Sequence, residues 1–212
     1  MFIGPPGSGK GTQAVRVAGR LSIPHISTGD ILRAAVRAES TLGRAVAATL
    51  ATGALVSDQV MTDLVCDRLQ AGDTSRGFIL DGFPRTGAQA RALDSMRPPE
   101  NLLVIHIAVA DEAIVRRLSS RRVCDACAIT QSVAPSEAAA HEMCPYCGGN
   151  LVRRPDDDPD TVRRRLGTYA SAAAAVLDVY RSRHGFITID GSRNADAVTA
   201  DILAFVTSRG AS

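Results

Sequence analysis

Residues 4–12 read GPPGSGKGT. They follow a short apolar run at residues 1–3 and precede a stretch with helical periodicity at residues 11–21. Glycine has no Cβ, so several backbone N–H groups of such a loop can converge on phosphate oxygens, and the N-terminus of the next helix adds partial positive charge. A strand, a glycine-rich loop and a helix in this order favour a phosphate-binding P-loop over a plain turn. We therefore predict nucleotide phosphate contacts from Gly7, Ser8, Gly9, Lys10, Gly11 and Thr12.

The loop has two unusual positions. Lys10 is the single lysine among 24 basic residues, and its compact, flexible ammonium suits a phosphate chain better than the broad guanidinium fork does. After this lysine the general P-loop pattern has a serine or threonine, but this chain has Gly11 and places the hydroxyl one residue later, at Thr12. We therefore expect Mg²⁺ to depend on phosphates and water more than on a loop hydroxyl.

Apolar runs alternate with helical patterns along the chain, which predicts an open parallel α/β sheet. Most of the apolar runs lack two-fold alternation, as expected of strands covered on both faces. The predicted strands are residues 1–3, 23–27, 77–80, 102–109 and 186–189. The predicted helices are residues 11–21, 30–38, 58–71, 86–95, 111–119, 160–182 and 194–208.

Residues 121–158 interrupt this alternation and contain two C-x-x-C pairs, at 124–127 and 144–147. Their spacing is typical of a four-cysteine zinc site, although redox pairs and free thiols remain alternatives. Four protein ligands leave no open coordination position, so the metal would be structural and would fold a segment too short for its own core. The predicted ligands are Cys124, Cys127, Cys144 and Cys147, with Arg121, Arg122, Arg153 and Arg154 offsetting the thiolate charge.

The composition narrows the possible partners. The formal net charge is only +2, with acidic and basic residues interspersed, so no strongly cationic face for nucleic acid or an anionic membrane is implied. Residues 1–3 run directly into the glycine-rich loop and leave no room for a secretory signal, and no apolar run is long enough to span a bilayer. We expect a cytoplasmic protein without membrane or nucleic-acid partners.

Further motifs follow in a fixed order. They are STGD at residues 27–30 with Arg33, GALV at residues 53–56, DGFPRT at residues 81–86 with Gln89, Arg117 with Arg121, and an arginine-rich run at residues 154–165. Together with the loop they resemble the adenylate kinases, in the long-lid type of the nucleoside monophosphate kinases, over nearly the whole chain. The resemblance implies a P-loop NTPase-like five-stranded parallel sheet flanked by helices. It also implies a core of residues 1–26, 57–120 and 159–212, a helical AMP-binding segment at 27–56 and a lid at 121–158.

The resemblance also implies a reaction: Mg²⁺-dependent, direct in-line transfer that interconverts ATP and AMP with two ADP, in a monomer that binds only small nucleotides. The residues implied in catalysis are Lys10, Arg85, Arg121, Arg154 and Arg165. Those implied to bind ATP beside the loop are Arg117, Arg121, Thr130, Gln131 and Arg193. Those implied to bind AMP are Thr28, Arg33, Ala54, Leu55, Val56, Gly82, Phe83, Pro84, Arg85, Gln89, Arg154 and Arg165. Asp81 would hold the waters of Mg²⁺, or alternatively cap the turn before Pro84.

Some questions stay open at this point. AITQ at residues 128–131 stands where relatives with this lid have a glycine and an aromatic residue, which leaves the choice between ATP and GTP undecided. Thr86 and Gln89 favour AMP over pyrimidine acceptors, but a UMP/CMP-type kinase and a non-catalytic zinc-bearing nucleotide sensor are alternatives. Cys66 is expected to be buried on a helix, and Arg163 and Arg164 are expected on a solvated helix face.

Overall fold

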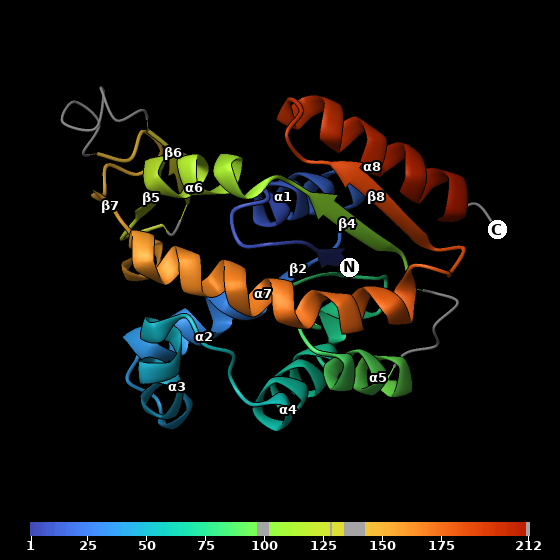
Figure 1. The fold of residues 1–212 in the computed structure, drawn as a ribbon, viewed down its shortest axis with the longest axis horizontal. Coiled ribbons are helices and arrows are strands. Elements are labelled where there is room, and N and C mark those ends of the chain that lie inside the picture. Colours follow the sequence, from blue (N-terminus) through green and yellow to red (C-terminus); the bar gives the residue numbers. More distant parts are fainter. Residues whose placement is uncertain (97–101, 128, 134–142, 211–212) are drawn as a thin grey trace.

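The computed structural model describes residues 1–96, 102–127, 129–133 and 143–210, and its central feature is a parallel sheet (Figure 1). Five strands pair in the order β2-β3-β1-β4-β8, and every pair is parallel. This arrangement confirms the predicted fold class. The strands are β1 (Phe2–Ile3), β2 (His25–Ser27), β3 (Ile79–Asp81), β4 (Val104–Ala108) and β8 (Phe186–Asp190).

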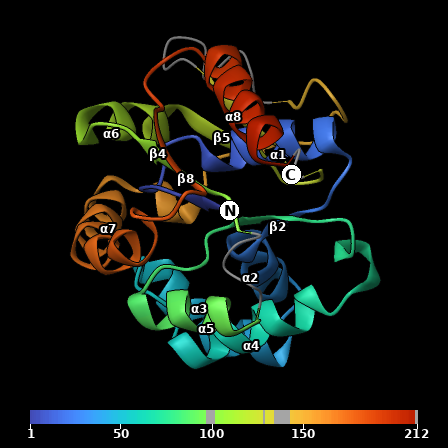
Figure 2. The same cartoon turned by 90° about the vertical axis from the view of Figure 1, so that its right-hand side faces the viewer.

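Helices cover both faces of the sheet, as Figure 2 shows with α1 and α8 on one side and α2 to α5 on the other. One apolar cluster, which includes Val17, Ile107 and Ile202, packs α1 and α8 against the sheet. A larger cluster, which includes Leu80, Phe83 and the fully buried Tyr180, fills the opposite side. The helices of the sheet layers are α1 (Lys10–Leu21), α4 (Asp58–Leu69), α5 (Gly87–Met96), α6 (Asp111–Ser120), α7 (Pro159–Tyr180) and α8 (Ala195–Gly210).

Strand register brings polar residues together at the carboxyl edge of the sheet. Ser27 at the end of β2 lies opposite Asp81 at the end of β3, and Phe2 of β1 is also paired with Asp81. The glycine-rich loop leaves β1 at this same edge. Ligands of open α/β sheets bind outside the carboxyl ends of the strands, so the sheet itself positions the loop beside the acidic residue.

Between β2 and α4 the chain forms two short packed helices, α2 (Thr28–Arg37) and α3 (Thr41–Thr52). Serine side chains cap both, because Ser27 accepts from the backbone N–H of Asp30 and Ser40 accepts from that of Gly43. The pattern of residues 30–38 predicted α2. It did not predict α3, whose small and mixed side chains give no clear apolar stripe.

Residues after α6 form a small three-stranded antiparallel sheet in the order β6-β5-β7. Its strands are β5 (Arg121–Cys124), β6 (Thr130–Ser132) and β7 (Leu151–Val152). The sequence predicted an irregular insertion here and none of these strands. The predicted lid includes residues 128 and 134–142, which lie outside the described residues. Among the helices that the structure describes, none is long and apolar enough to cross a membrane.

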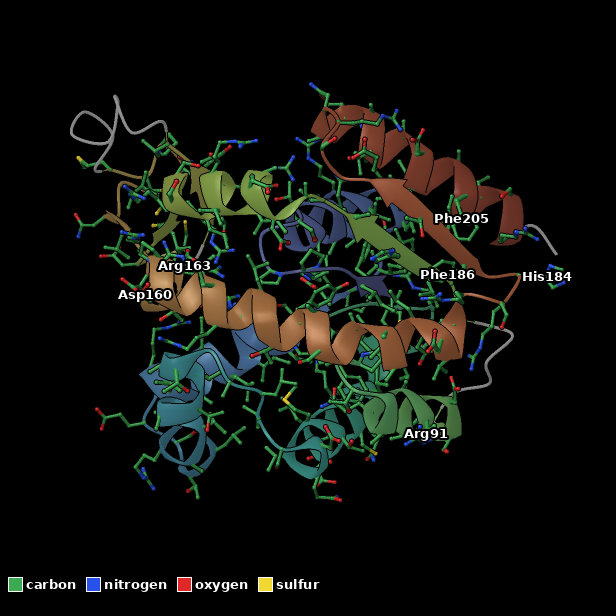
Figure 3. All side chains as sticks on the ribbon, in the orientation of Figure 1. Arg91, Asp160, Arg163, His184, Phe186 and Phe205 are labelled. Carbon is green, nitrogen blue, oxygen red and sulfur yellow. The ribbon has the colours of Figure 1, made fainter. Side chains whose placement is uncertain are left out.

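Two further expectations about side chains can be compared with the structure. Arg163 is solvated and pairs with Asp160 at the start of α7, as expected (Figure 3). Arg164 instead reaches α3, where its Nε donates to the carbonyl of Thr52 at 3.1 Å. Cys66 is half-buried on α4, not fully buried as predicted, and its Sγ accepts from Nε2 of Gln70 at 3.6 Å.

Candidate active site

The glycine-rich loop adopts the backbone conformation that a phosphate cradle needs. Gly7 and Gly9 have φ of 78° and 100°, a region that residues with a side chain rarely occupy. Gly9 is the N-cap of α1 and brings no side chain to the free N–H groups of the first helical turn. These groups therefore remain available to an anion.

Lys10 folds back over this loop. Its Nζ donates to the carbonyl oxygens of Gly4 at 2.7 Å and Pro5 at 2.8 Å. Burial lowers the pKa of Lys10 to about 8; Asp81 opposes the shift, while Arg85, Arg165 and Arg121 add to it. The ammonium thus lies within the field of several other cations, where an arriving phosphate would be its strongest partner.

Four arginines from distant parts of the chain line the same cleft as Lys10, and they share an excess of positive charge. Burial, then Arg33 and Arg121, lowers the pKa of Arg154 to about 10. Burial, followed by Arg121 among the nearby cations, also lowers the pKa of Arg165, although Asp156 and Asp157 oppose this shift. Such mutual repulsion identifies a site built to hold a polyanion. These four arginines are Arg85, Arg121, Arg154 and Arg165; Arg16, Arg33, Arg117 and Arg193 line the cleft as well.

Two aspartates just before α7 fix the arginine geometry, and the sequence analysis gave them no role. Asp157, whose side chain is 0% exposed, accepts from both Nε and Nη2 of Arg121, the first bond at 2.7 Å. Asp156 lies 2.8 Å from Nη1 of Arg165. Burial alone would raise the pKa of Asp156. The nearby arginines lower this pKa, and Arg165 has the largest effect among them. Asp156 therefore stays charged, and the ion pairs of both aspartates orient the guanidinium groups.

Asp81 faces the loop from the end of β3. A Cβ on Gly11 would lie 3.5 Å from its Oδ2, so the glycine leaves space between loop and carboxylate. The imidazole of His25 lies beside it: Nε2 is 3.6 Å from Oδ2 and has no hydrogen-bond partner among the described residues. Unlike Asp156 and Asp157, Asp81 forms no ion pair with an arginine in the part of the chain that the structure describes. A hard oxygen ligand in this position fits the hydration shell of a magnesium ion.

A second pocket opens on the other side of these arginines, between α2, α3 and α5. Its walls combine apolar residues with charged ones, a mixture suited to a base and a phosphate. The predicted AMP-binding residues on this pocket are Arg33, Ala54, Leu55, Val56, Arg85, Gln89 and Arg165. Gly82, Pro84 and Arg154 line the adjoining main cleft. Gly29, Leu32, Leu50, Gly53 and Met61 also line the pocket but were not predicted.

Two of the predicted AMP-binding residues have side chains that do not line the pocket. Thr28 is buried, and its Oγ1 donates to the carbonyl of Asp81 at 3.3 Å. Phe83 is 0% exposed and belongs to the core. Both therefore shape the wall of the site from behind.

The donor side of the cleft is closed by Arg117. Its Nη2 donates to the carbonyl of Gly191 at 2.7 Å, and its Nη1 donates to that of Ser8 at 3.4 Å. The guanidinium plane is thus held between the loop and the turn after β8. Arg193 of the same turn pairs with Asp201, while Thr130 and Gln131 reach the cleft from β6.

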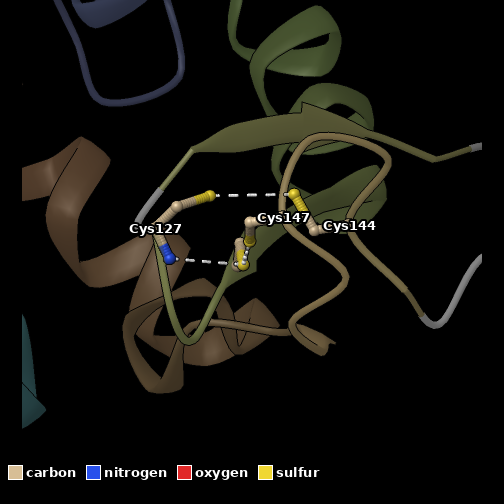
Figure 4. A group of neighbouring side chains, drawn as sticks. Cys127, Cys144 and Cys147 are labelled. Atoms are coloured by element: carbon tan, nitrogen blue, oxygen red, sulfur yellow. Dashed lines mark hydrogen bonds between the residues drawn. The ribbon is translucent and has the colours of Figure 1, made fainter.

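Four cysteines form one cluster, of which Figure 4 labels Cys127, Cys144 and Cys147. Their Sγ atoms all lie within 4.8 Å of one another, with 3.4 Å between Cys124 and Cys147 and 3.7 Å between Cys127 and Cys144. Four thiolates bound tetrahedrally to zinc would be about 3.8 Å apart, so the cluster fits this ion. In the cluster without a metal, a backbone N–H bond from Cys127 lowers the pKa of Cys124 to about 7, whereas burial and neighbouring thiols raise the pKa of Cys127 and of Cys147. Binding of zinc as a thiolate complex would therefore release protons.

The arginines expected to offset the thiolate charge have other partners. Arg121 binds Asp157, and Arg153 donates to the carbonyl of Asp157 at 2.7 Å. Arg122 donates to the carbonyl of its neighbour Arg121. Arg121 and Arg153 thereby stabilise the junction with α7, and the role predicted for these arginines beside the thiolates stays a prediction.

Comparison with known proteins agrees with this geometry. The sequence model of a family described as "Adenylate kinase" matches residues 2–185. An adenylate kinase of Treponema denticola is 42% identical over 94% of this chain and 95% of its own. One of Kosmotoga olearia is 44% identical over 95% of each chain, and one of Methanocella arvoryzae is 41% identical over 97% of each. The chain therefore belongs to the adenylate kinase family.

Proposed function

We propose that the protein catalyses the Mg²⁺-dependent, reversible transfer of a phosphoryl group from ATP to AMP, giving two ADP. The observation that carries this proposal is the gathering of Lys10 with Arg85, Arg121, Arg154 and Arg165 in one cleft; two of these arginines, Arg85 and Arg165, also line the adjoining pocket. Phosphoryl transfer spreads negative charge over the equatorial oxygens of the moving group, and positioned cations stabilise that charge. Family membership supports the same reaction.

The residues divide between the two substrates. The loop and Lys10 bind the donor phosphates, with Arg117 against the donor base. Arg33 and Arg85 bind the acceptor phosphate, and Gln89 reads the acceptor base. Arg121, Arg154 and Arg165 neutralise the negative charge of the phosphoryl group during its transfer.

No covalent intermediate with the protein is needed. The nucleophile is a phosphate oxygen of AMP, which is already anionic, so no side chain has to remove a proton from it. The chain's task is to place the two nucleotides in line and to exclude water that would hydrolyse ATP. Residues 121–158, as a lid, and residues 27–56, as the acceptor-binding segment, close the site from two sides.

Two metals complete the proposal. Magnesium, when bound with ATP, supplies charge neutralisation at the phosphates, and Asp81 would hold its water ligands. Zinc, bound by the four cysteines, would be structural because no coordination position stays open.

The assembly and location follow from the same residues. One chain supplies every group of this site, so we take the active form to be a monomer, which sedimentation at assay concentration can test. Its cysteines are all free thiols in the structure, which suits the reducing cytoplasm.

The decisive assay compares acceptors. Initial rates with ATP and Mg²⁺ are measured for AMP, UMP, CMP and GMP, and AMP is expected to have the highest kcat/KM. A clear preference for UMP or CMP would replace the proposal with a pyrimidine-directed kinase. Binding of ATP and AMP without any ADP formation would indicate a nucleotide sensor.

A further inference from the structure

The side-chain amide of Gln89 lies between two partners whose hydrogen-bonding chemistry is fixed. Gln89 is 1% exposed and lies in the first turn of α5, on the wall of the acceptor pocket. Its Oε1 accepts from the backbone N–H of Arg85 at 2.8 Å. Its Nε2 donates to Oδ1 of Asp58 at 2.8 Å. Asp58 comes from another element, the first residue of α4.

These partners permit only one orientation of the amide. A backbone N–H can only donate, and an ionised carboxylate can only accept. The amide oxygen must therefore face Arg85 and its nitrogen must face Asp58. Thr86 strengthens the arrangement, because its Oγ1 donates to the same Asp58 oxygen at 3.0 Å and accepts from the N–H of Gln89 at 3.2 Å.

The fixed amide has one acceptor and one donor position left for a ligand: the second lone pair of Oε1 and the second hydrogen of Nε2. A 6-aminopurine presents a donor at the 6-amino group and an acceptor at N1. A 6-oxopurine presents the reverse, an acceptor at O6 and a donor at N1. The ribose and phosphate fix the direction of the base, so only the amide could adapt to the second pattern.

We propose that Asp58, by fixing the orientation of Gln89, makes the acceptor pocket select 6-aminopurine over 6-oxopurine nucleoside monophosphates. The inference rests on the proposed function and adds a positioning residue to it. To bind a 6-oxopurine the amide would have to turn over. It would then set its NH2 group against the Arg85 N–H and its oxygen against the Asp58 carboxylate, and both contacts are repulsive in a buried place.

The test is the isosteric variant Asp58→Asn. Values of kcat/KM are measured for AMP and for IMP, with ATP as donor. Asparagine can donate to a turned amide, so we expect the AMP to IMP ratio to fall about tenfold, partly through a gain for IMP. The KM for ATP should not change. Asp63→Asn is the matched control, because exposed Asp63 accepts the same kind of bond from Gln59 at 2.8 Å on the same helix.

An unchanged ratio in Asp58→Asn, or an equal loss for AMP and IMP, would overturn the proposal and leave Asp58 with a purely structural role. Thermal melting checks that Asp58→Asn folds. If Asp58→Asn does not fold, the AMP to IMP ratio is measured in Asp58→Ala, which also removes the repulsion between the Asp58 carboxylate and a turned Gln89 amide. Calorimetric binding of AMP and IMP to the wild type and the variant tests the selectivity proposal separately from the proposed kinase activity. A wild type that binds AMP selectively without turnover would contradict the proposed function alone.

Discussion

The glycine-rich loop and the cysteine lid both hold residues against the nucleotide cleft, but different forces organise them. The loop leaves a strand buried at the centre of the sheet, and apolar clusters on both faces hold its surroundings. The small sheet of the lid has a buried cluster of four residues, two of which are cysteines. The hydrophobic effect therefore suffices for the loop, whereas in the proposed function a zinc ion would hold the strands of the lid together.

The largest effect is expected at the loop, from Lys10→Arg. The guanidinium is too broad for the space beneath the carbonyls of Gly4 and Pro5, and it cannot follow the moving phosphoryl group as a point charge. We expect kcat to fall at least about a hundredfold while the melting temperature hardly changes. Coupled ADP assays and thermal melts measure both quantities, and near-normal turnover would refute the role of Lys10.

In the lid the corresponding change is Cys144→Ser with Cys147→Ser. It should abolish the binding of one zinc per chain and lower the melting temperature by about 5 °C or more. Turnover at low temperature should fall less than in the lysine variant. Metal analysis and calorimetry provide the readouts.

Cys66→Ser is the matched control, since Cys66 lies on α4 outside the cluster. It should leave the zinc content unchanged. If the metal-free wild type were as stable as the zinc-loaded protein, zinc would not stabilise the lid, and the proposed difference between lid and loop would be wrong.

A smaller effect is expected from pH. Burial, with nearby arginines, lowers the pKa of Lys10 to about 8 in the free protein, and bound phosphates raise it again. The complex then binds more protons than the free protein above pH 8, so the affinity for ATP should decline by up to about tenfold per pH unit there. Titration calorimetry with ATP between about pH 7 and 9.5 measures this slope. Lys10→Met should show no such decline in ATP affinity. An equally steep decline in that variant would mean that a group other than Lys10 causes it.

The contrast between loop and lid also explains how far the sequence could be interpreted. All five strands of the parallel sheet and the helices around it follow from buried apolar runs and helical periodicity. Helix α3 and strands β5 to β7 do not, because they have few buried residues and depend on contacts with other segments. Helix α3 packs on α2, and the strands lie beside the cysteine cluster.

Within the site, the residues with a local motif were found and their partners were not. Lys10, Arg85 and the cysteines stand in recognisable patterns. Asp58 and Asp157 act through contacts with residues far along the chain, Gln89 and Arg121 respectively, and locally each looks like an ordinary acidic residue near a helix start. The only local signal for Asp58 was its place directly after the helix cap Ser57.

The central claim is that the cations gathered around Lys10 pass a phosphoryl group directly between two nucleotides. Phosphorus NMR of the protein with ATP, AMP and Mg²⁺ tests it most directly. Two ADP are expected to appear for each ATP consumed, without accumulation of inorganic phosphate. Release of inorganic phosphate in step with ATP loss, or an unchanged spectrum, would contradict it.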